Sequence, residues 1–357
     1  MLIPTIEGTL FSFFIWLIAF IVYRPAIKTK NQGKGNYIFF FLIVSISVVF
    51  AFTVGDFYHY YPLYKSLARG FYDNSMEDFY NDLVKHIPDS YFIWRFAVWG
   101  ASTFLLIQTY KRVNSPVRLS CLIFVLILII NFGSSRNTLG YMLLYYSMTF
   151  IFKPLKNKTF SFILAITGVF LSTYLHKSMP LYIALIIIAF VPMNKNTYRL
   201  SLLAFPFIYI SFGVISNYLL TLDLGGGDFE KSGILYLEGE NFSRPTVFGY
   251  IQMSVARTPI LILLYLLINN ILDGTIKDRF VIHFAKYSYF LIYISFIFFN
   301  QETSSFLSQR FWDASLFPIA LAIPLGIYLK SDRKITISFY LLLLANIYSF
   351  AYYMYKL

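Results

Sequence analysis

The sequence has few charged residues and almost no cysteine. Only 13% of the 357 residues are Asp, Glu, Lys or Arg, whereas a soluble protein carries about 25%. The single cysteine, Cys121, lies inside an apolar run, which excludes an intramolecular disulfide and a cysteine-based metal site. The sequence also lacks a Gly-x-x-x-x-Gly-Lys phosphate loop, a dinucleotide-binding glycine pattern and a His-Glu-x-x-His zinc motif. These absences argue against a soluble enzyme that uses a nucleotide or zinc.

Long apolar runs are abundant instead. Hydrophobic residues make up 58% of the chain and aromatic residues 21%. Runs of about 18 apolar residues recur along the whole length, and each is long enough to cross the ~30 Å hydrocarbon core of a bilayer. They show no polar–apolar alternation, so they must be helices. The sequence therefore predicts an all-α polytopic membrane protein, with a single integral membrane domain over residues 1–357. The first run lacks a basic start and a cleavage site, and we interpret it as a retained helix.

We expect about twelve transmembrane helices. They lie near residues 3–23, 37–54, 91–110, 117–133, 138–152, 159–175, 179–193, 200–220, 248–271, 281–299, 311–329 and 335–355. The runs near 138–152 and 179–193 are short enough to be tilted, broken or partly interfacial.

The basic residues fall into alternate loops. Of the 29 Lys and Arg residues, 18 lie in every second loop, together with only three acidic residues. Such a bias marks the cytoplasmic side of a membrane protein. Both termini are therefore expected outside, and the net charge of +12 needs no nucleic-acid partner to explain it.

Two expected outer segments are long. Within residues 55–90, the run Ser75–Asp78 has the features of a helix N-terminus, and Phe79, Leu83 and Val84 would form an apolar stripe. This pattern predicts a short amphipathic helix on the membrane surface. Residues 221–247 contain three consecutive glycines, Gly225–Gly227, and five acids, which favours a mobile loop over the outer face.

Arg136, His176 and Arg310 each stand at the end of an apolar run, and the charge bias puts all three on the outer face. Ionisable residues beside hydrocarbon are costly and often functional. Arginine offers a planar fork for phosphate or carboxylate oxygens, and histidine can accept a proton or, as a cation, pair with an oxyanion. Structural interpretations also exist: an arginine can reach lipid headgroups, an isolated histidine is usually structural, and Asp313 lies one helical turn from Arg310 as an ion-pair partner. We interpret the trio as one site for an anionic or sugar-bearing substrate.

Three more residues complete the candidate set. Asp56 ends a span, where a carboxylate can act as a base, orient an arginine or bind sugar hydroxyls, although its flanking tyrosines also fit an ordinary interfacial belt. Arg257 lies deeper in an apolar run and is costlier to leave unpaired. Arg244, in the outer loop, can meet a polyanionic headgroup, and solvation explains it equally well. The histidines show no metal-ligand spacing.

With these residues placed, the chain resembles the EpsG-like, Wzy-type bacterial polysaccharide polymerases. The resemblance covers roughly residues 50–330. It rests on the order and spacing of four short segments, Gly55–Tyr60, Ser135–Gly140, Leu175–Leu181 and Ser308–Phe311.

The resemblance implies an inverting, metal-independent glycosyltransferase of the GT-C type that needs no cofactor. It would move a growing glycan from undecaprenyl pyrophosphate to the non-reducing end of a lipid-linked repeat unit at the outer face of the bacterial plasma membrane, as in O-antigen, capsule or exopolysaccharide synthesis. Arg136 and Arg310 would hold the pyrophosphate with support from Arg257, and His176 or Asp56 would be the base. The implied partners are the undecaprenyl-pyrophosphate-linked oligosaccharide, membrane lipids, and the flippase and chain-length regulator of the same pathway.

Three other functions stay open. An O-antigen ligase uses the same lipid donor, and the sequence separates it poorly from a polymerase. A polysaccharide transporter or flippase often has about twelve spans, but such proteins bind substrate near the midplane and not at one surface. A membrane acyltransferase should carry its catalytic histidine early in the chain, and none precedes His59.

Overall fold

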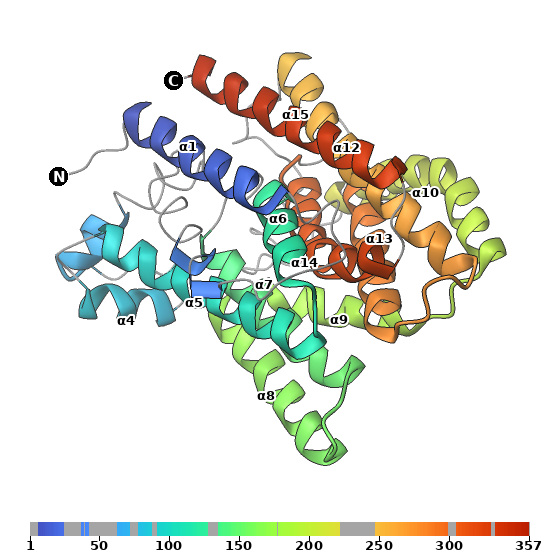
Figure 1. The fold of residues 1–357 in the computed structure, drawn as a ribbon, viewed down its shortest axis with the longest axis horizontal. Helices are drawn as coiled ribbons and strands as arrows, with labels where there is room; N and C mark the ends of the chain where they lie inside the picture. The colour runs from blue at the N-terminus through green and yellow to red at the C-terminus, as the bar shows by residue number, and fades with distance from the viewer. Residues whose placement is uncertain are drawn as a thin grey trace.

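The computed structural model describes residues 6–24, 37–38, 40–42, 63–71, 78–87, 91–127, 135–176, 178–221, 247–298, 305–329 and 333–356. All regular secondary structure in these ranges is helical (Figure 1). The helices are α1 (Ile6–Tyr23), α4 (Asp78–His86), α5 (Tyr91–Val113), α6 (Val117–Ile127), α7 (Ser135–Phe152), α8 (Lys158–Leu175), α9 (Met179–Phe190), α10 (Lys195–Thr221), α12 (Val247–Leu272), α13 (Arg279–Ile297), α14 (Ser305–Leu329) and α15 (Arg333–Lys356).

The predicted all-α fold is confirmed for the described residues, and the helices follow the apolar runs closely. The run near 37–54 is the exception, because only residues 37–38 and 40–42 of it are described, and these are helical. By length and composition, Lys158–Leu175, Ser254–Leu272 and Arg279–Ile297 are able to cross a membrane. The molecule is therefore compatible with a membrane protein.

α9 is too short to cross a bilayer alone. It has 12 residues, which at 1.5 Å per residue gives a helix of about 18 Å, against a hydrocarbon core of ~30 Å. The run near 179–193 was expected to be short, and the helix ends at Phe190. α9 begins beside one of the candidate site residues, His176, so its length and position bear directly on the site.

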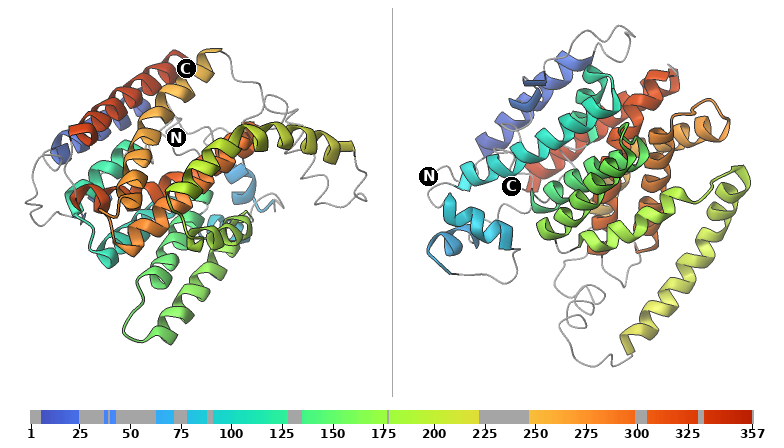
Figure 2. Two further views of the ribbon diagram at one scale, coloured as in Figure 1. Left: turned by 90° about the vertical axis from the view of Figure 1, so that its right-hand side faces the viewer. Right: turned by 90° about the horizontal axis from the view of Figure 1, so that it is seen from below.

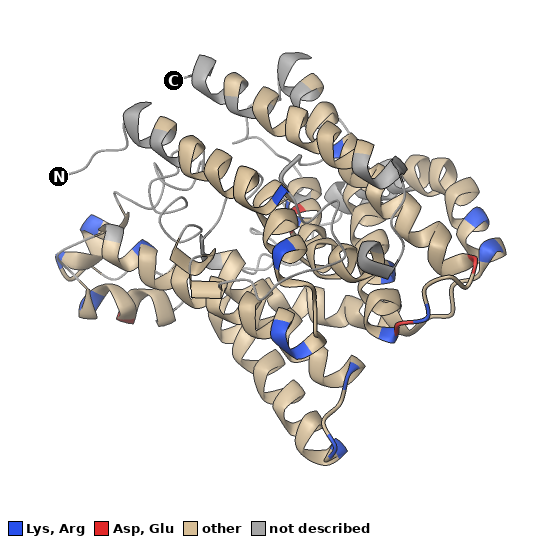
Figure 3. Ribbon diagram, in the orientation of Figure 1, with Lys and Arg blue, Asp and Glu red and all other residues tan. Residues whose placement is uncertain are grey.

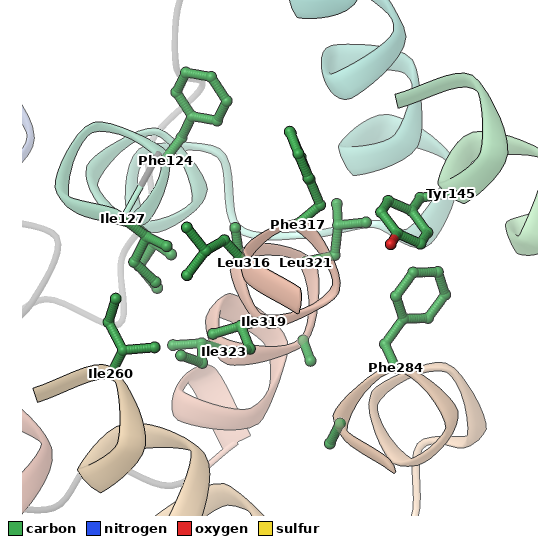
Figure 4. Packing of buried hydrophobic residues seen from close by; sticks show 14 of the residues in the cluster. Phe124, Ile127, Tyr145, Ile260, Phe284, Leu316, Phe317, Ile319, Leu321 and Ile323 are labelled. Carbon is green, nitrogen blue, oxygen red and sulfur yellow. The ribbon is translucent and has the colours of Figure 1, made fainter. Parts of the chain in front are cut away.

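α14 lies at the centre of the packing and contacts α6, α7, α12 and α13. Figure 4 shows Leu316 and Phe317 of α14 among Phe124 of α6, Ile260 of α12 and Phe284 of α13. All five side chains are buried. The contact between α13 and α14 is the most extensive in the described structure. This packing fixes the position of the residues at the start of α14.

Two prolines, Pro318 and Pro324, lie inside α14 without ending it. Proline has no N–H, so the carbonyl four residues earlier loses its helical donor. For Pro318 that carbonyl belongs to Ala314, and the Tyr145 hydroxyl of α7 donates to it at 2.8 Å. The Tyr110 hydroxyl of α5 donates at 3.2 Å to the carbonyl that Pro324 leaves open. Both carbonyls belong to buried residues, and these two hydroxyls allow the helix to continue past its prolines.

Helix ends that the charge bias assigns to one side meet one another. Lys195, which begins α10, forms an ion pair of 2.7 Å with Asp273, which follows α12. Arg112 of α5 donates to the carbonyl of Lys153, after α7, at 2.5 Å. Figure 3 shows Lys and Arg at the turn between α7 and α8 and around the ends of α10 and α13. These two contacts fit the predicted grouping of the loops, and the membrane side on which the loops lie stays a prediction.

The predicted amphipathic helix is present as α4, which begins at Asp78. Its apolar side chains contact protein: Tyr80 and Val84 are fully buried in a cluster with Trp94 of α5 and Leu175 of α8. α4 therefore covers the ends of α5 and α8 next to His176. Whether it also touches the membrane surface stays a prediction.

Two helices expose most of their apolar side chains. Phe162 and Phe170 of α8 are 62% and 71% exposed, and Leu203 and Phe207 of α10 are 70% and 73% exposed. Figure 2 shows the last part of α10 extending away from the other helices. Apolar surface on this scale is what lipid-facing helices present.

Candidate functional site

His176 forms the junction between α8 and α9. It is the C-cap of α8, with extended backbone angles, and its N–H donates to the carbonyl of Ser172 at 3.1 Å. Its carbonyl accepts from the N–H of Met179, in the first turn of α9, at 3.0 Å. The side chain is only 8% exposed. The imidazole is thus held between two helices and does not move freely at a surface.

Ser178 fixes the orientation and tautomer of this ring. Its backbone N–H lies 3.0 Å from His176 Nδ1 and its Oγ lies 2.9 Å away. A backbone N–H can only donate, so Nδ1 must supply a lone pair and the neutral ring carries its proton on Nε2. Ser178 is the N-cap of α9, yet its side chain makes no capping hydrogen bond. A serine at this position usually caps the helix, and here its hydroxyl faces His176.

α7 passes close to His176 at Gly140. A Cβ added at Gly140 would lie 3.4 Å from His176 Cβ and 3.2 Å from Met179 Cε. Arg136 lies four residues earlier in α7, on the same face and in its first turn. The structure therefore brings the backbone of Arg136 within one turn of the His176 contact, while its side chain is not among those described.

Tyr182 of α9 connects this region to Arg310. Its hydroxyl lies 3.4 Å from the carbonyl of Arg310, and its ring packs edge-on against Tyr141 of α7 and Phe311 of α14, with centroids 5.1 and 5.7 Å apart. α14 begins at Ser305, so Arg310 lies in its second turn, whereas the sequence suggested a loop residue before the helix.

Arg257 is 6% exposed and lies at the junction of α12 and α14. Its Nη2 donates to Gln309 Oε1 at 2.7 Å, and its guanidinium carbon lies 4.7 Å from the centroid of Trp312. The Gln309 amide donates in turn to Asp313 at 2.6 Å. Burial makes such a cation expensive unless it is hydrogen-bonded, and the neighbouring glutamine and aromatic ring lower that cost.

These contacts join His176, Arg310 and Arg257 into one region, with the backbone of Arg136 at its edge. We call it the outer cluster, after the side predicted from the charge bias. Asp56 and Arg244 lie outside the described residues and stay predictions, as does the ion pair between Arg310 and Asp313. In the part of the chain that the structure describes, no three His, Cys, Asp or Glu side chains are placed to hold a metal ion.

Several members of this region escaped the sequence-based prediction. Tyr182, Gln309 and Ser178 are ordinary polar residues near helix ends, and only their contacts reveal a role. A further buried arginine, Arg95, was also missed. It lies within the apolar run of α5 and meets the criterion that singled out Arg257. It is 1% exposed.

Comparison with known proteins identifies a family. A model of the EpsG family matches residues 35–357. Neither the curated proteins nor the solved structures contain a match to this chain.

Proposed function

This chain belongs to the EpsG family, and on that premise we propose that it is a membrane glycosyltransferase that polymerises polysaccharide repeat units. The donor is a growing glycan on undecaprenyl pyrophosphate, and the acceptor is the non-reducing end of a lipid-linked repeat unit. The reaction takes place at the outer face of the bacterial plasma membrane. The observation that carries this proposal is the outer cluster, in which Tyr182 links the helix that follows the buried His176 to Arg310, and Gln309, next to Arg310, binds the buried Arg257.

The cluster suits a pyrophosphate leaving group. In a direct displacement, the acceptor hydroxyl attacks the anomeric carbon, the bond from that carbon to the pyrophosphate oxygen breaks, and the configuration inverts. Negative charge then develops on the pyrophosphate, and fixed cations that already surround it lower the barrier. Arg136 and Arg310 hold the pyrophosphate, Arg257 supports them from its site against Trp312, and Arg244 adds a further cation from the outer loop. Arginines supply this charge without a metal ion.

His176 acts as a hydrogen-bond donor to a phosphate oxygen. The sequence left open whether His176 or Asp56 is the base. The hydrogen bond from the Ser178 N–H occupies the Nδ1 lone pair, and the protonated Nε2 of the neutral ring has no lone pair with which to accept a proton. This geometry favours the phosphate-partner role for His176. The acceptor proton is then assigned to Asp56, the carboxylate at the end of the second apolar run.

The proposed topology has twelve membrane segments in a GT-C-like arrangement, with both termini outside. Eleven cross the bilayer as helices, and the short α9 crosses it together with the residues that connect it to α10. The ion pair between Lys195 and Asp273 supports this topology, since it joins two loops that the charge bias places in the cytoplasm. The outer cluster lies at the starts of α7, α9 and α14. The charge bias places these helix starts on the outer side. A flippase and a chain-length regulator act in the same pathway.

A glycan profile tests the proposal. Cells that lack this gene are complemented with the wild type, with Arg310→Ala, or with Arg199→Ala as a control on the exposed surface of α10. We expect single repeat units in the deletion strain, and a long-chain ladder with the wild type and the control but not with Arg310→Ala at equal protein abundance.

Other outcomes identify the alternatives. Long chains that accumulate on undecaprenyl pyrophosphate in the deletion strain would make the protein a ligase. Unpolymerised lipid-linked units trapped on the cytoplasmic side would make it a flippase. A ladder restored fully by Arg310→Ala would remove this arginine from the site.

A further inference from the structure

An apolar groove runs between α10 and α12, with α13 as its floor. Its volume is about 310 Å³, at the lower end of the ~300–1,000 Å³ of small-molecule sites. The lining residues are aliphatic or aromatic, and six of the eleven are Tyr or Phe: Tyr198, Leu202, Phe205, Leu261, Leu264, Tyr265, Ile268, Tyr289, Ile292, Tyr293 and Phe296. A groove of this volume holds a segment of a chain and not a whole lipid.

The groove begins one helical turn from Arg257, a member of the outer cluster. Arg257, Leu261, Leu264 and Ile268 follow one another in α12 at spacings of four, three and four residues, which places them on one helix face. The last three line the groove. At 1.5 Å per residue, this face extends about 16 Å from the buried guanidinium along the groove. On the floor, Phe296 adjoins Ser295, whose hydroxyl donates to the carbonyl of Ser308 in α14 at 2.7 Å.

Polar contacts between α10 and α13 hold two walls of the groove together. Ser201 Oγ lies 2.7 Å from the Tyr289 hydroxyl, and the Tyr293 hydroxyl donates to the carbonyl of Ser201 at 2.9 Å. The side of the groove is open, because Leu202 and Tyr265 at its rims are 48% and 54% exposed. The groove therefore has a buried cation one helical turn from Leu261 at one end and an opening at its side.

We propose that this groove binds a segment of the isoprenoid chain of the lipid-linked substrate, with the phosphate of that lipid at Arg257. The proposal rests on the function proposed above. An apolar groove that opens to the bilayer is filled by hydrocarbon, and its aromatic walls offer flat faces to the planar double bonds of an isoprenoid chain.

The position of Arg257 favours this lipid over an ordinary phospholipid. The Arg257 side chain is 6% exposed and is held between Gln309 and Trp312 of α14. A phospholipid of the surrounding bilayer keeps its phosphate at the interface and does not reach such a group. A substrate whose pyrophosphate enters the outer cluster places its chain directly in the groove.

Photo-crosslinking tests the groove without any assay of activity. p-Benzoylphenylalanine replaces Leu202, which lines the groove, or Leu203, its exposed neighbour on α10 that does not. The full chain is placed in nanodiscs of phosphatidylethanolamine and phosphatidylglycerol that contain undecaprenyl phosphate. We expect about tenfold more undecaprenyl adduct at position 202 than at 203, with phospholipid adducts showing no such preference. Equal undecaprenyl adducts at both positions, or phospholipid alone at position 202, would overturn the proposal.

A kinetic experiment then separates the groove from the reaction. Leu202→Trp narrows the groove at its rim, and Leu203→Trp is the matched control. We expect Leu202→Trp to raise KM about tenfold, or ~1.4 kcal/mol, for an undecaprenyl-linked donor and not for a geranyl-linked one. A rise that is equal for both donors, or no rise, would contradict the groove assignment. A wild type without polymerase activity would refute the proposed function, and the crosslinking result would still decide whether the groove binds an isoprenoid.

Discussion

Removal of one hydroxyl group from α7 should destabilise the neighbouring helix α14 at the centre of the core. The change is Tyr145→Phe. The Tyr145 side chain is 1% exposed, and its hydroxyl donates at 2.8 Å to the carbonyl of Ala314, which is fully buried and has no helical donor because residue 318 is proline. The substitution keeps the ring and its packing and leaves this carbonyl without a donor.

The expected cost follows from the environment of the carbonyl. A buried acceptor left unsatisfied costs about 1–3 kcal/mol, and side-chain hydrogen bonds in a membrane protein are worth on average ~0.6 and at most ~1.7 kcal/mol. We therefore expect Tyr145→Phe to lower the free energy of unfolding by about 1–2 kcal/mol. Tyr174→Phe, on the exposed face of α8, is the control and should change it by less than about 0.5 kcal/mol.

A double-mutant cycle tests the cause. Pro318→Ala restores an N–H that can donate to the Ala314 carbonyl, so Tyr145→Phe should cost much less in that background. The measurement is the unfolding free energy of the four proteins by steric trapping in detergent micelles. A coupling energy of about 1 kcal/mol is expected. If Tyr145→Phe costs the same in the Pro318→Ala background as in the wild type, the hydroxyl does not compensate for the proline and the reasoning fails.

Three further changes should have distinct effects. His176→Gln places an amide donor near the Nε2 position and should keep about a tenth of the polymerisation rate, whereas loss of a general base lowers the rate 10²–10⁴-fold. If His176→Gln and His176→Ala are equally inactive in a chain-elongation assay, His176 is the general base. Gln309→Leu removes the acceptor that lies 2.7 Å from Arg257 Nη2 and should slow chain elongation about tenfold, while an immunoblot shows normal protein abundance. An unchanged rate would exclude a role for Gln309 in positioning Arg257. Gly168→Ala adds a Cβ that overlaps Ser147 Oγ and should lower the free energy of unfolding by about 1–3 kcal/mol in the same assay. Ser147→Gly should restore part of this loss. An unchanged free energy of unfolding in Gly168→Ala would mean that α7 and α8 move apart easily.

The helices could be predicted from the sequence because hydrophobic length is a local property. The apolar runs located α8, α12 and α13, and the acids before Phe79 located the start of α4. The prolines of α14 show the limit of such reasoning. A proline inside a run usually predicts a kink or an end, and the helix continues because a hydroxyl from α7, 169 residues away in the chain, donates to the open carbonyl.

The candidate site was predictable only in part, for a similar reason. Charge in an apolar run identified His176, Arg257 and Arg310, and the structure places them in one region. Their partners depend on packing between distant helices, so the Gln309 acceptor and the Ser178 donor carried no signal of their own. Arg95 was missed although the same rule applied to it. Asp56 lies outside the described residues and stays a prediction.

The short helix α9 is fixed at a defined height within the molecule. The His283 ring nitrogen lies 2.9 Å from the carbonyl of Ala189, and Lys286 donates to the carbonyl of Val191 at 2.6 Å, so two side chains of α13 bind the last turn of α9 and the residue after it. Nearer the start of α9, the carbonyl of Tyr182 accepts from the Tyr287 hydroxyl. α9 therefore acts as a spacer of constant length that sets His176 relative to the start of α14.

A spacer of this kind limits how the gene can evolve. One residue inserted in α9 would move His176 by about 1.5 Å along the helix axis and rotate it by about 100° relative to the bound carbonyls. Insertions in the loop between α7 and α8 have no such effect on the site. Relatives should therefore vary in length between residues 153 and 157 and keep a constant number of residues between His176 and the carbonyls bound by α13.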